Sequence, residues 1–119
     1  MKLVVAYVRE KCAASVVREL HKADIGGITA YPVRGMSGEV TPVFYSKRPF
    51  EIGHLPDAVK FEVVCPEESV DRIVNLLAQA ARTGEPGDGI VAVQNVERVV
   101  RISHMNHAAR SSKRREAYE

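Results

Sequence analysis

Tryptophan is absent from this sequence, and aromatic residues make up only 6% of it. The two cysteines, Cys12 and Cys65, lie far apart in different sequence contexts and give no disulfide framework. No apolar run approaches the roughly 20 residues that a membrane-spanning helix needs. The residues after Met1 lead into a strand-like segment instead of a signal peptide. These absences predict a cytoplasmic protein with no direct membrane insertion.

An excess of either charge is also missing, because 17 Lys and Arg residues stand against 15 Asp and Glu residues. Residues 104–119 hold four of the cations and two of the acids, which leaves 13 of each in the rest of the chain. A neutral body with a short basic tail gives no electrostatic footprint for nucleic acid. The length suits a single core, so we predict one domain over residues 1–103 and a basic C-terminal tail over residues 104–119.

Apolar residues recur at i, i+3, i+4 and i+7 in two segments, and each segment is predicted to be a helix. These residues are Ala13, Val16, Val17 and Leu20 in the first segment, and Val70, Ile73, Val74 and Leu77 in the second. Gly26-Gly27 and Gly84 are the predicted stop signals. Strands are predicted at residues 2–9, 28–34, 60–65 and 90–93, and the alternation over residues 96–102 predicts a short fifth strand. Pro32 favours a sheet edge for the second strand.

This order of elements predicts an α+β, ferredoxin-like split βαβ fold, βαββαβ plus a short C-terminal strand. Two helices cover one face of the sheet in such a fold. The first strand is nevertheless apolar on both faces, with Val4, Ala6 and Val8 opposite Leu3, Val5 and Tyr7. Burying sheet faces between subunits is the simple way to cover the second face, so the pattern predicts an oligomer.

The segment Thr83–Gly89 has the glycine-rich sequence TGEPGDG. Closely spaced glycines let the backbone approach an anion and point N–H groups at it, although a helix stop followed by an Asp-Gly turn would use the same residues. The segment occurs together with Arg101, with Arg34-Gly35 at the start of a long loop, and with Leu55-Pro56 and Val59–Glu62 at its end. In this combination the sequence resembles the PII signal-transduction family over most of its length.

The resemblance implies a regulatory protein, not an enzyme, that forms a homotrimer and binds an adenine nucleotide (ADP, AMP or ATP) in clefts between subunits. A long loop, called the T-loop in the family, falls on residues 36–57 and docks on a regulated enzyme or membrane transporter. Carried over by position, the nucleotide-binding residues are Thr29, Gly35, Ser37, Gly38, Glu62, Val64, Gly87, Asp88, Gly89, Ile90, Arg101 and Ser103. The partner-binding loop includes Glu39, Tyr45, Lys47, Arg48 and Phe50.

Two nucleotide-binding positions depart from the family pattern. A basic residue normally follows Gly-Asp-Gly, where this chain has Ile90, and an arginine normally stands two residues after Arg101, where this chain has Ser103. Each lost cation removes a charge-assisted phosphate bond, on the order of 1.5–3 kcal/mol. We therefore expect ADP or AMP to be favoured over ATP, unless Lys47, Arg48 or the tail arginines replace the lost cations.

The resemblance also bears on a second ligand and on modification of the loop. The family uses a glutamine and a lysine to help hold Mg²⁺ and 2-oxoglutarate, and this chain has Glu39 and Ala58 (or Asp57) there. An acid repels a dicarboxylate, so 2-oxoglutarate sensing of the usual kind is not expected, although Glu39 could still ligate Mg²⁺. The tyrosine that is modified in enteric members falls at Phe50, which has no hydroxyl group.

The alternative function is a trimeric, ferredoxin-like metal-binding or metal-tolerance protein. His104 and His107 are spaced i, i+3 in the tail, but two histidines without a third ligand are weak candidates for a metal site. The glycine-rich loop favours the nucleotide hypothesis, since a metal carrier needs no phosphate cradle. No Ser-His-Asp, Cys-His or paired-carboxylate arrangement is recognisable, so an enzyme is not predicted.

Overall fold

The computed structural model describes residues 1–36, 38 and 51–104. Its strands and helices are, in chain order, β1 (Lys2–Arg9), α1 (Ala13–Lys22), β2 (Thr29–Arg34), β3 (Asp57–Cys65), α2 (Val70–Ala81) and β4 (Gly89–Asn95). Short 3₁₀ turns occupy Glu10–Cys12, Ile52–His54, Glu67–Ser69 and Ile102–His104. The order βαββαβ is the order that the sequence predicts.

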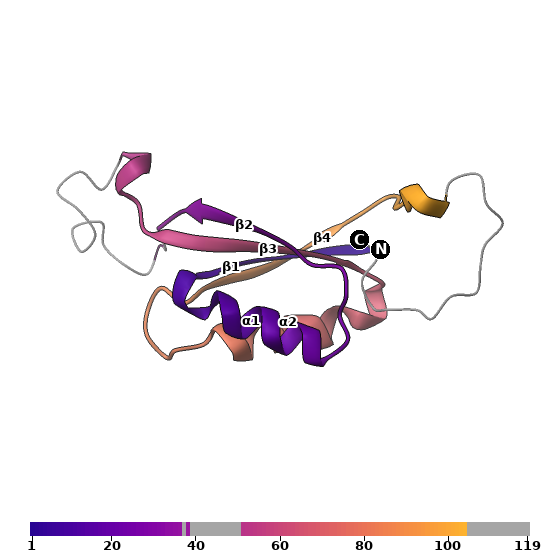
Figure 1. Cartoon of the computed structure of the whole chain (residues 1–119), viewed down its shortest axis with the longest axis horizontal. Helices are drawn as coiled ribbons and strands as arrows, with labels where there is room; N and C mark the ends of the chain where they lie inside the picture. Colours follow the sequence, from indigo (N-terminus) through magenta and orange to yellow (C-terminus); the bar gives the residue numbers. More distant parts are fainter. Residues whose placement is uncertain (37, 39–50, 105–119) are drawn as a thin grey trace.

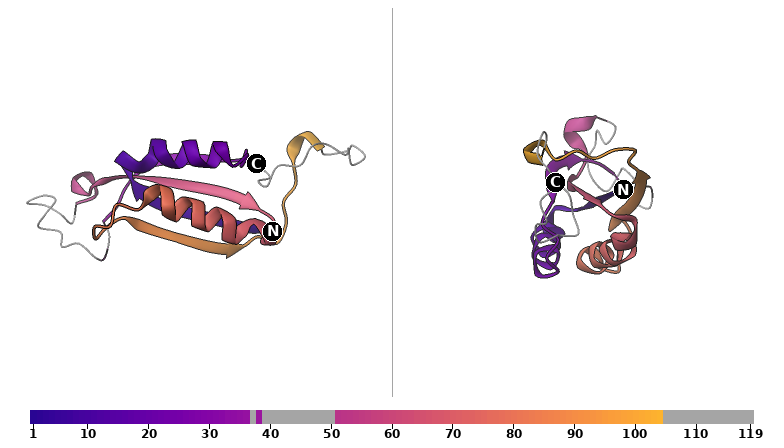
Figure 2. Two further views of the ribbon diagram at one scale, coloured as in Figure 1. Left: turned by 90° about the horizontal axis from the view of Figure 1, so that it is seen from below. Right: turned by 90° about the vertical axis from the view of Figure 1, so that its right-hand side faces the viewer.

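The four strands form one sheet in the order β2-β3-β1-β4, and all neighbouring strands are antiparallel. α1 and α2 lie beside each other on one face of this sheet (Figures 1 and 2). The predicted α+β ferredoxin-like fold is therefore confirmed. β2 is an edge strand, as Pro32 indicates, because an edge tolerates a residue without an N–H donor. Within the described ranges, no helix is both long enough and apolar enough to cross a bilayer.

The hydrophobic core lies between the two helices and the sheet. Side chains alternate along a strand, so Phe61, Val63 and Cys65 of β3 point at the helices, as predicted, while Glu62 and Val64 point to the other face. The largest fully buried side chains are Phe61, Leu20, Ile25, Ile73, Leu77, Val4, Val16, Val63 and Cys65. Cys65 and Cys12 are buried free thiols.

Helix α1 differs from the predicted pattern at one position and at its end. Val17 is 46% exposed, because Val16 and Leu20 make the contact with the core and Val17 lies one residue round the helix from that line. The helix also ends at Lys22, before the predicted Gly26-Gly27 stop. Asp24 adopts a φ of 60° there, and the N–H groups of Asp24 and Ile25 donate to the carbonyls of His21 and Leu20 at 3.0 Å. This is a Schellman cap with aspartate in the place of glycine.

The predicted fifth strand over residues 96–102 is wrong. β4 ends at Asn95, the N–H of Val96 donates to the carbonyl of Met1 at 3.1 Å, and the chain then leaves the sheet. β4 is an edge strand, so within the described chain no further strand lies beside this segment to accept its hydrogen bonds. Ile102 is consequently 92% exposed in the 3₁₀ turn that follows.

Gly89 holds the start of β4 against β1 at a distance that only glycine permits. Its φ is +114°, and a Cβ atom built on it would lie 1.8 Å from the carbonyl oxygen of Tyr7. Two barriers therefore oppose any side chain at this position: the left-handed backbone conformation and a direct collision with the neighbouring strand.

Replacing Gly89 by alanine is expected to lower the free energy of unfolding by about 3 kcal/mol or more, because the strand must move to admit the Cβ atom. The matched control is Gly53→Ala, since Gly53 has open space around its Cα atom and no positive φ, and it should change stability by about 0.5 kcal/mol or less. Urea unfolding at one fixed protein concentration measures both. Equal effects of the two substitutions would contradict this account of Gly89.

Candidate functional site

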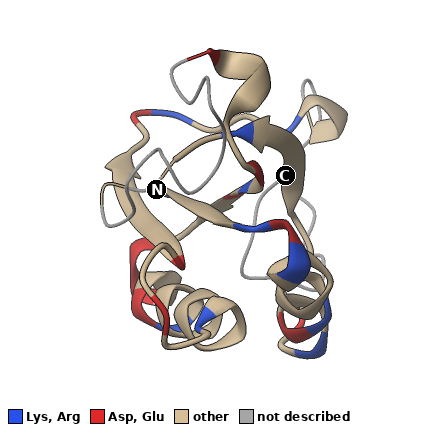
Figure 3. Cartoon of the chain, turned by 90° about the vertical axis from the view of Figure 1, so that its left-hand side faces the viewer, with Lys and Arg blue, Asp and Glu red and all other residues tan. Residues whose placement is uncertain are grey.

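An open cleft of about 770 Å³ lies at the end of the sheet where β1 and β2 finish and β3 and β4 begin. Antiparallel pairing brings these strand ends together, because Val8 stands opposite both Val59 and Gly89. Figure 3 views the molecule from this end, where acidic and basic segments both occur. The described lining comprises Tyr7, Val8, Arg9, Glu10, Lys11, Val33, Arg34, Gly35, Met36, Gly38, Pro56, Asp57, Ala58, Lys60, Gly87, Gly89 and Ile90.

One wall of the cleft is the base of the long loop. The N–H of Gly35 donates to the carbonyl of Pro56 at 3.0 Å. Arg34 Nη1 donates to the carbonyl of Leu55 at 3.1 Å and lies 3.4 Å from Asp57 Oδ1. These contacts join the two ends of residues 36–57, so the loop leaves and re-enters the domain at the cleft.

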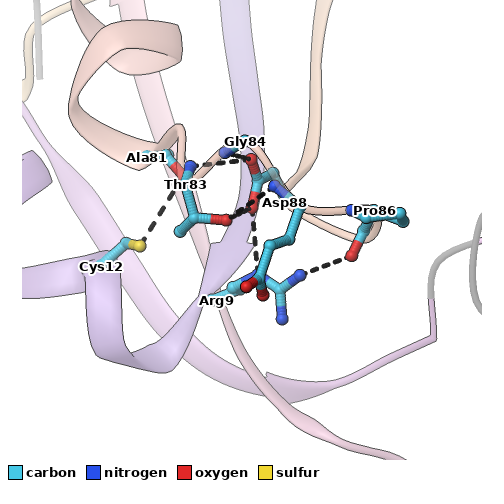
Figure 4. A network of polar contacts seen from close by, with 8 residues as sticks. Arg9, Cys12, Ala81, Thr83, Gly84, Pro86 and Asp88 are labelled. Carbon is cyan, nitrogen blue, oxygen red and sulfur yellow. Dashed lines mark hydrogen bonds and ion pairs between the residues drawn. The ribbon is translucent and has the colours of Figure 1, made fainter.

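The opposite wall is the glycine-rich loop between α2 and β4, which the Asp88 carboxylate organises from within (Figure 4). Its Oδ2 accepts the N–H groups of Thr83 at 2.8 Å and Gly84 at 3.1 Å, and its Oδ1 accepts the Thr83 hydroxyl. These hydrogen bonds, the one from the Thr83 hydroxyl first, hold the pKa of the Asp88 carboxyl well below its usual range. Gly84 and Gly87 have φ values of +88° and +91°, so the loop shape requires glycine at both positions.

Arg9 ties this loop to the end of β1. Its Nε donates to Asp88 Oδ1 at 3.1 Å, and its Nη2 donates to the carbonyl of Pro86 at 2.6 Å (Figure 4). The sequence prediction did not include Arg9. The strand register could have identified Arg9. Val8 of β1 pairs with Gly89 of β4, so the residue after Val8, Arg9, comes beside the residue before Gly89, Asp88.

Lys60 forms a second polar cluster, on the sheet face that the helices leave open. Its Nζ lies 5.7 Å from the ring centre of Tyr7, 5.4 Å from that of Tyr31 and 3.4 Å from Glu62 Oε2. The hydrogen bond with Glu62 is the main cause that raises the pKa of Lys60. Tyr31 donates its hydroxyl to Glu62 as well, so the Glu62 carboxylate is already engaged within its own chain. The sequence prediction did not include Lys60, Tyr7 or Tyr31 among the site residues.

The structure brings part of the predicted nucleotide-binding set to the cleft, namely Gly35, Gly38, Gly87, Gly89 and Ile90. Asp88 lies in the same loop, with its carboxylate turned toward the loop backbone and Arg9. Ile90 is 63% exposed and offers an apolar side chain where the family pattern has a cation.

Thr29, Glu62 and Val64 lie farther along the sheet. Thr29 stands directly opposite Glu62 across β2 and β3, and Val64 stands opposite Leu3 of β1. None of the three lines the described cleft. They share the sheet face away from the helices, as the strand alternation predicts.

Arg101 and Ser103 lie at the other end of the molecule. They follow Asn95, which pairs with Lys2 at the opposite end of β1 from Val8 and Gly89. Figure 1 places the Ile102–His104 turn at the right and the glycine-rich loop at the left. Arg101 falls within the fifth strand that was predicted over residues 96–102. It stands instead in a segment without regular structure, and a single chain does not bring it to the glycine-rich loop.

Some predicted residues lie outside the described part of the chain: Ser37, Glu39, Tyr45, Lys47, Arg48, Phe50 and His107. His104 is described and is exposed in its 3₁₀ turn. Among the described residues, no cluster of three or more His, Cys, Asp and Glu side chains could hold a metal ion.

The family model for nitrogen regulatory protein P-II matches residues 1–106. The P-II 2 protein of Methanothermobacter thermautotrophicus is 35% identical over 86% of this chain and 89% of its own length. The P-II proteins of Haemophilus influenzae and Azospirillum brasilense are 34% and 35% identical, each over 86% of this chain and 91% of their own length. This chain belongs to the P-II family.

Membership confirms the family that the sequence resembles and the regulatory class that the resemblance implies. P-II proteins are signal-transduction proteins that act on partner proteins, so a regulatory P-II protein is what this fold and sequence support. The glycine-rich loop and the base of the long loop both contribute to one cleft of this P-II protein.

The lowered pKa of Asp88 makes one contribution to stability depend on pH. A carboxyl whose pKa is lower in the folded than in the unfolded chain stabilises the fold as a carboxylate, and this contribution is lost as the pH falls below its ordinary value of 3.8. The difference in unfolding free energy between the wild type and Asp88→Asn should thus be largest near neutral pH, should begin to shrink below about pH 5, and should go on shrinking as the pH falls toward the lowered pKa of the folded carboxyl.

Urea unfolding at several pH values measures this difference, with Glu68→Gln as the control because Glu68 is an exposed carboxylate outside the cleft. A difference between wild type and Asp88→Asn that stays constant from pH 7 to pH 3 would mean that the loop does not depend on the charged carboxylate.

Proposed function

We propose that this P-II protein is a cytoplasmic regulator that binds adenine nucleotides in clefts between the subunits of a homotrimer. ADP or AMP is favoured over ATP, and the protein controls a partner enzyme or membrane transporter through residues 36–57. The observation that carries the proposal is the cleft in which the preformed glycine-rich loop faces the base of the long loop.

The chemistry of the cleft suits a phosphate-bearing ligand. Glycines with positive φ in the Gly84–Gly89 loop let an anion approach the backbone without a side chain in between. Arg9, Lys11, Arg34 and Lys60 add positive charge to the lining. The lining also carries apolar surface, including Val33 and Ile90, against which a base or ribose can pack.

The division of the predicted residues supports a site between subunits. Within one subunit, Gly87–Gly89 and Arg101 lie near opposite ends of the sheet. A second subunit must therefore supply one of the two if both contact the same nucleotide. The β4 edge and the segment after it also expose apolar side chains that an oligomer would cover: Ile90, Val93, Val100 and Ile102.

The pairing of charges in the cleft supports the preference for fewer phosphates. Arg9 is engaged by Asp88, Arg34 lies 3.4 Å from Asp57, and Lys60 lies 3.4 Å from Glu62. Lys11 is the remaining cation of the described lining, and it forms no ion pair with a described residue. Little uncompensated positive charge is therefore left for a third phosphate group.

ADP or AMP should bind at least as tightly as ATP in isothermal titration calorimetry. Restoring the two missing cations with Ile90→Lys and Ser103→Arg should raise the affinity for ATP relative to AMP by about tenfold or more, because each adds a charge-assisted phosphate contact. The control is Ala14→Arg with Val17→Lys, which adds the same charges at exposed positions of α1 and should leave the ratio unchanged. A wild type that strongly prefers ATP, with no response to the restored cations, would contradict the proposed preference.

Light scattering tests the trimer. At micromolar concentration the expected mass is about three times the 13.1 kDa of one chain, because the open sheet face and the β4 edge need cover. A mass near that of a single chain would contradict the proposed site, because that site requires residues from two subunits.

A further inference from the structure

We propose that Arg9 is a positioning residue: it holds the Gly84–Gly89 loop in its ligand-receiving shape through Asp88 and Pro86, and so sets the affinity of the cleft for any nucleotide. The inference rests on the proposed nucleotide site, and it concerns a residue that lies outside the predicted binding set.

The Gly84–Gly89 loop needs a residue that fixes its conformation, because its three glycines leave its backbone with many accessible conformations. Gly84, Gly87 and Gly89 can each adopt many backbone conformations, and fixing them costs more entropy than fixing other residues. Gly89 is held by its pairing with Val8 of β1. The stretch between Ala81 and Gly89 has no such ladder, so side chains must define its shape.

Arg9 and Asp88 together provide that definition. The Asp88 carboxylate gathers the backbone at Thr83 and Gly84, at the start of the loop. The Arg9 guanidinium holds Asp88 at 3.1 Å and the carbonyl of Pro86, at the middle of the loop, at 2.6 Å. Arg9 is thus the described side chain through which β1 restrains the loop at two points (Figure 4).

The anchor of Arg9 is itself rigid. Arg9 is the last residue of β1 and stands opposite Ala58 of β3, while the preceding Val8 belongs to the buried core. Its side chain is 29% exposed, and that of Asp88 is 23% exposed, so water competes only partly for the pair. A planar guanidinium can bind two acceptors at once, which an ammonium group cannot do with the same geometry.

The effect of Arg9 on binding depends on the fraction of molecules whose loop has the conformation that receives the ligand. When the receiving shape of the loop is only partly populated, the apparent affinity for every ligand of that shape falls by the same fraction. A positioning role therefore predicts an equal loss for AMP, ADP and ATP. A direct contact between Arg9 and the phosphates predicts a loss that grows with the number of phosphate groups.

The first experiment measures the affinity of AMP, ADP and ATP for Arg9→Gln by calorimetry. The expected result is a loss of about tenfold that is the same for the three nucleotides within about twofold. Arg9→Lys should lie in between, because it keeps the charge and one of the two contacts. The matched control is Arg72→Gln, whose Nη2 also donates to a backbone carbonyl, that of Ala23 at 2.9 Å, but away from the cleft. It should bind all three as the wild type does.

A double-mutant cycle tests whether Arg9 acts through Asp88. In an Asp88→Ala background the loop has lost its internal carboxylate, so Arg9→Gln should cost about threefold or less. Alanine is preferred to asparagine here because an amide oxygen could still accept a hydrogen bond from Arg9. A loss that rises from AMP to ATP would overturn the proposal in favour of direct phosphate binding. A loss that persists in full without Asp88 would overturn the part of the proposal in which Arg9 acts through Asp88.

Hydrogen exchange of the free protein separates this proposal from the proposed function. Arg9→Gln should speed exchange of the Thr83 and Gly84 amides, which donate to Asp88, while Arg72→Gln should leave these amides unchanged. Unchanged exchange in Arg9→Gln would overturn the positioning role even if nucleotides bind. A wild type that binds no adenine nucleotide would overturn the proposed function, and exchange would then decide the role of Arg9 alone.

Discussion

The close backbone approach of Gly89 to Tyr7 is the constraint on which the rest of this structure depends. It sets β4 against β1 from its first residue. Because β1 also pairs with β3, the same contact brings the loop before β4 beside the strand ends that carry the base of the long loop. The cleft exists because four antiparallel strands reverse at one end of the sheet, and its glycine-rich wall stands there because a residue without a side chain lets two strands meet.

Much of the fold could be predicted from the sequence, because the spacing of apolar residues indicates which side chains are buried. In this architecture a single buried layer, between the two helices and the sheet, determines how the elements pack. The alternation around Phe61 and the helical spacing of Val16 and Leu20 both correspond to core contacts. The predictions were wrong for the end of α1 and for the segment after Asn95, where burial of apolar side chains does not determine the backbone conformation. Asp24 caps α1 through a local backbone conformation that periodicity does not report. The alternation after Asn95 is typical of a strand, but hydrogen bonding requires a neighbour, and β4 is already at the edge of the sheet.

The candidate site was predicted unevenly for a similar reason. Its glycines are visible in the sequence, since closely spaced glycines are typical of a loop whose backbone turns sharply or receives a ligand. Arg9 and Lys60 act through cross-strand neighbours, and a single sequence does not state which residues face each other until the register is known. Asp88 illustrates the difference: its place in the loop was predictable, whereas the orientation of its carboxylate, turned inward to Thr83 and Gly84, depends on the three-dimensional course of the backbone.

The placement of the cleft also bears on how a ligand could affect residues 36–57. Both ends of that segment are joined by the contacts of Gly35 with Pro56 and of Arg34 with Leu55 and Asp57. Arg34 and Gly35 both belong to the lining of the same cleft. Under the proposed function, an anion bound in this cleft would compete with the Asp57 carboxylate for the positive charge of Arg34. Such an anion would therefore disturb an ion pair that joins the two ends of residues 36–57, which the proposed function assigns to partner control.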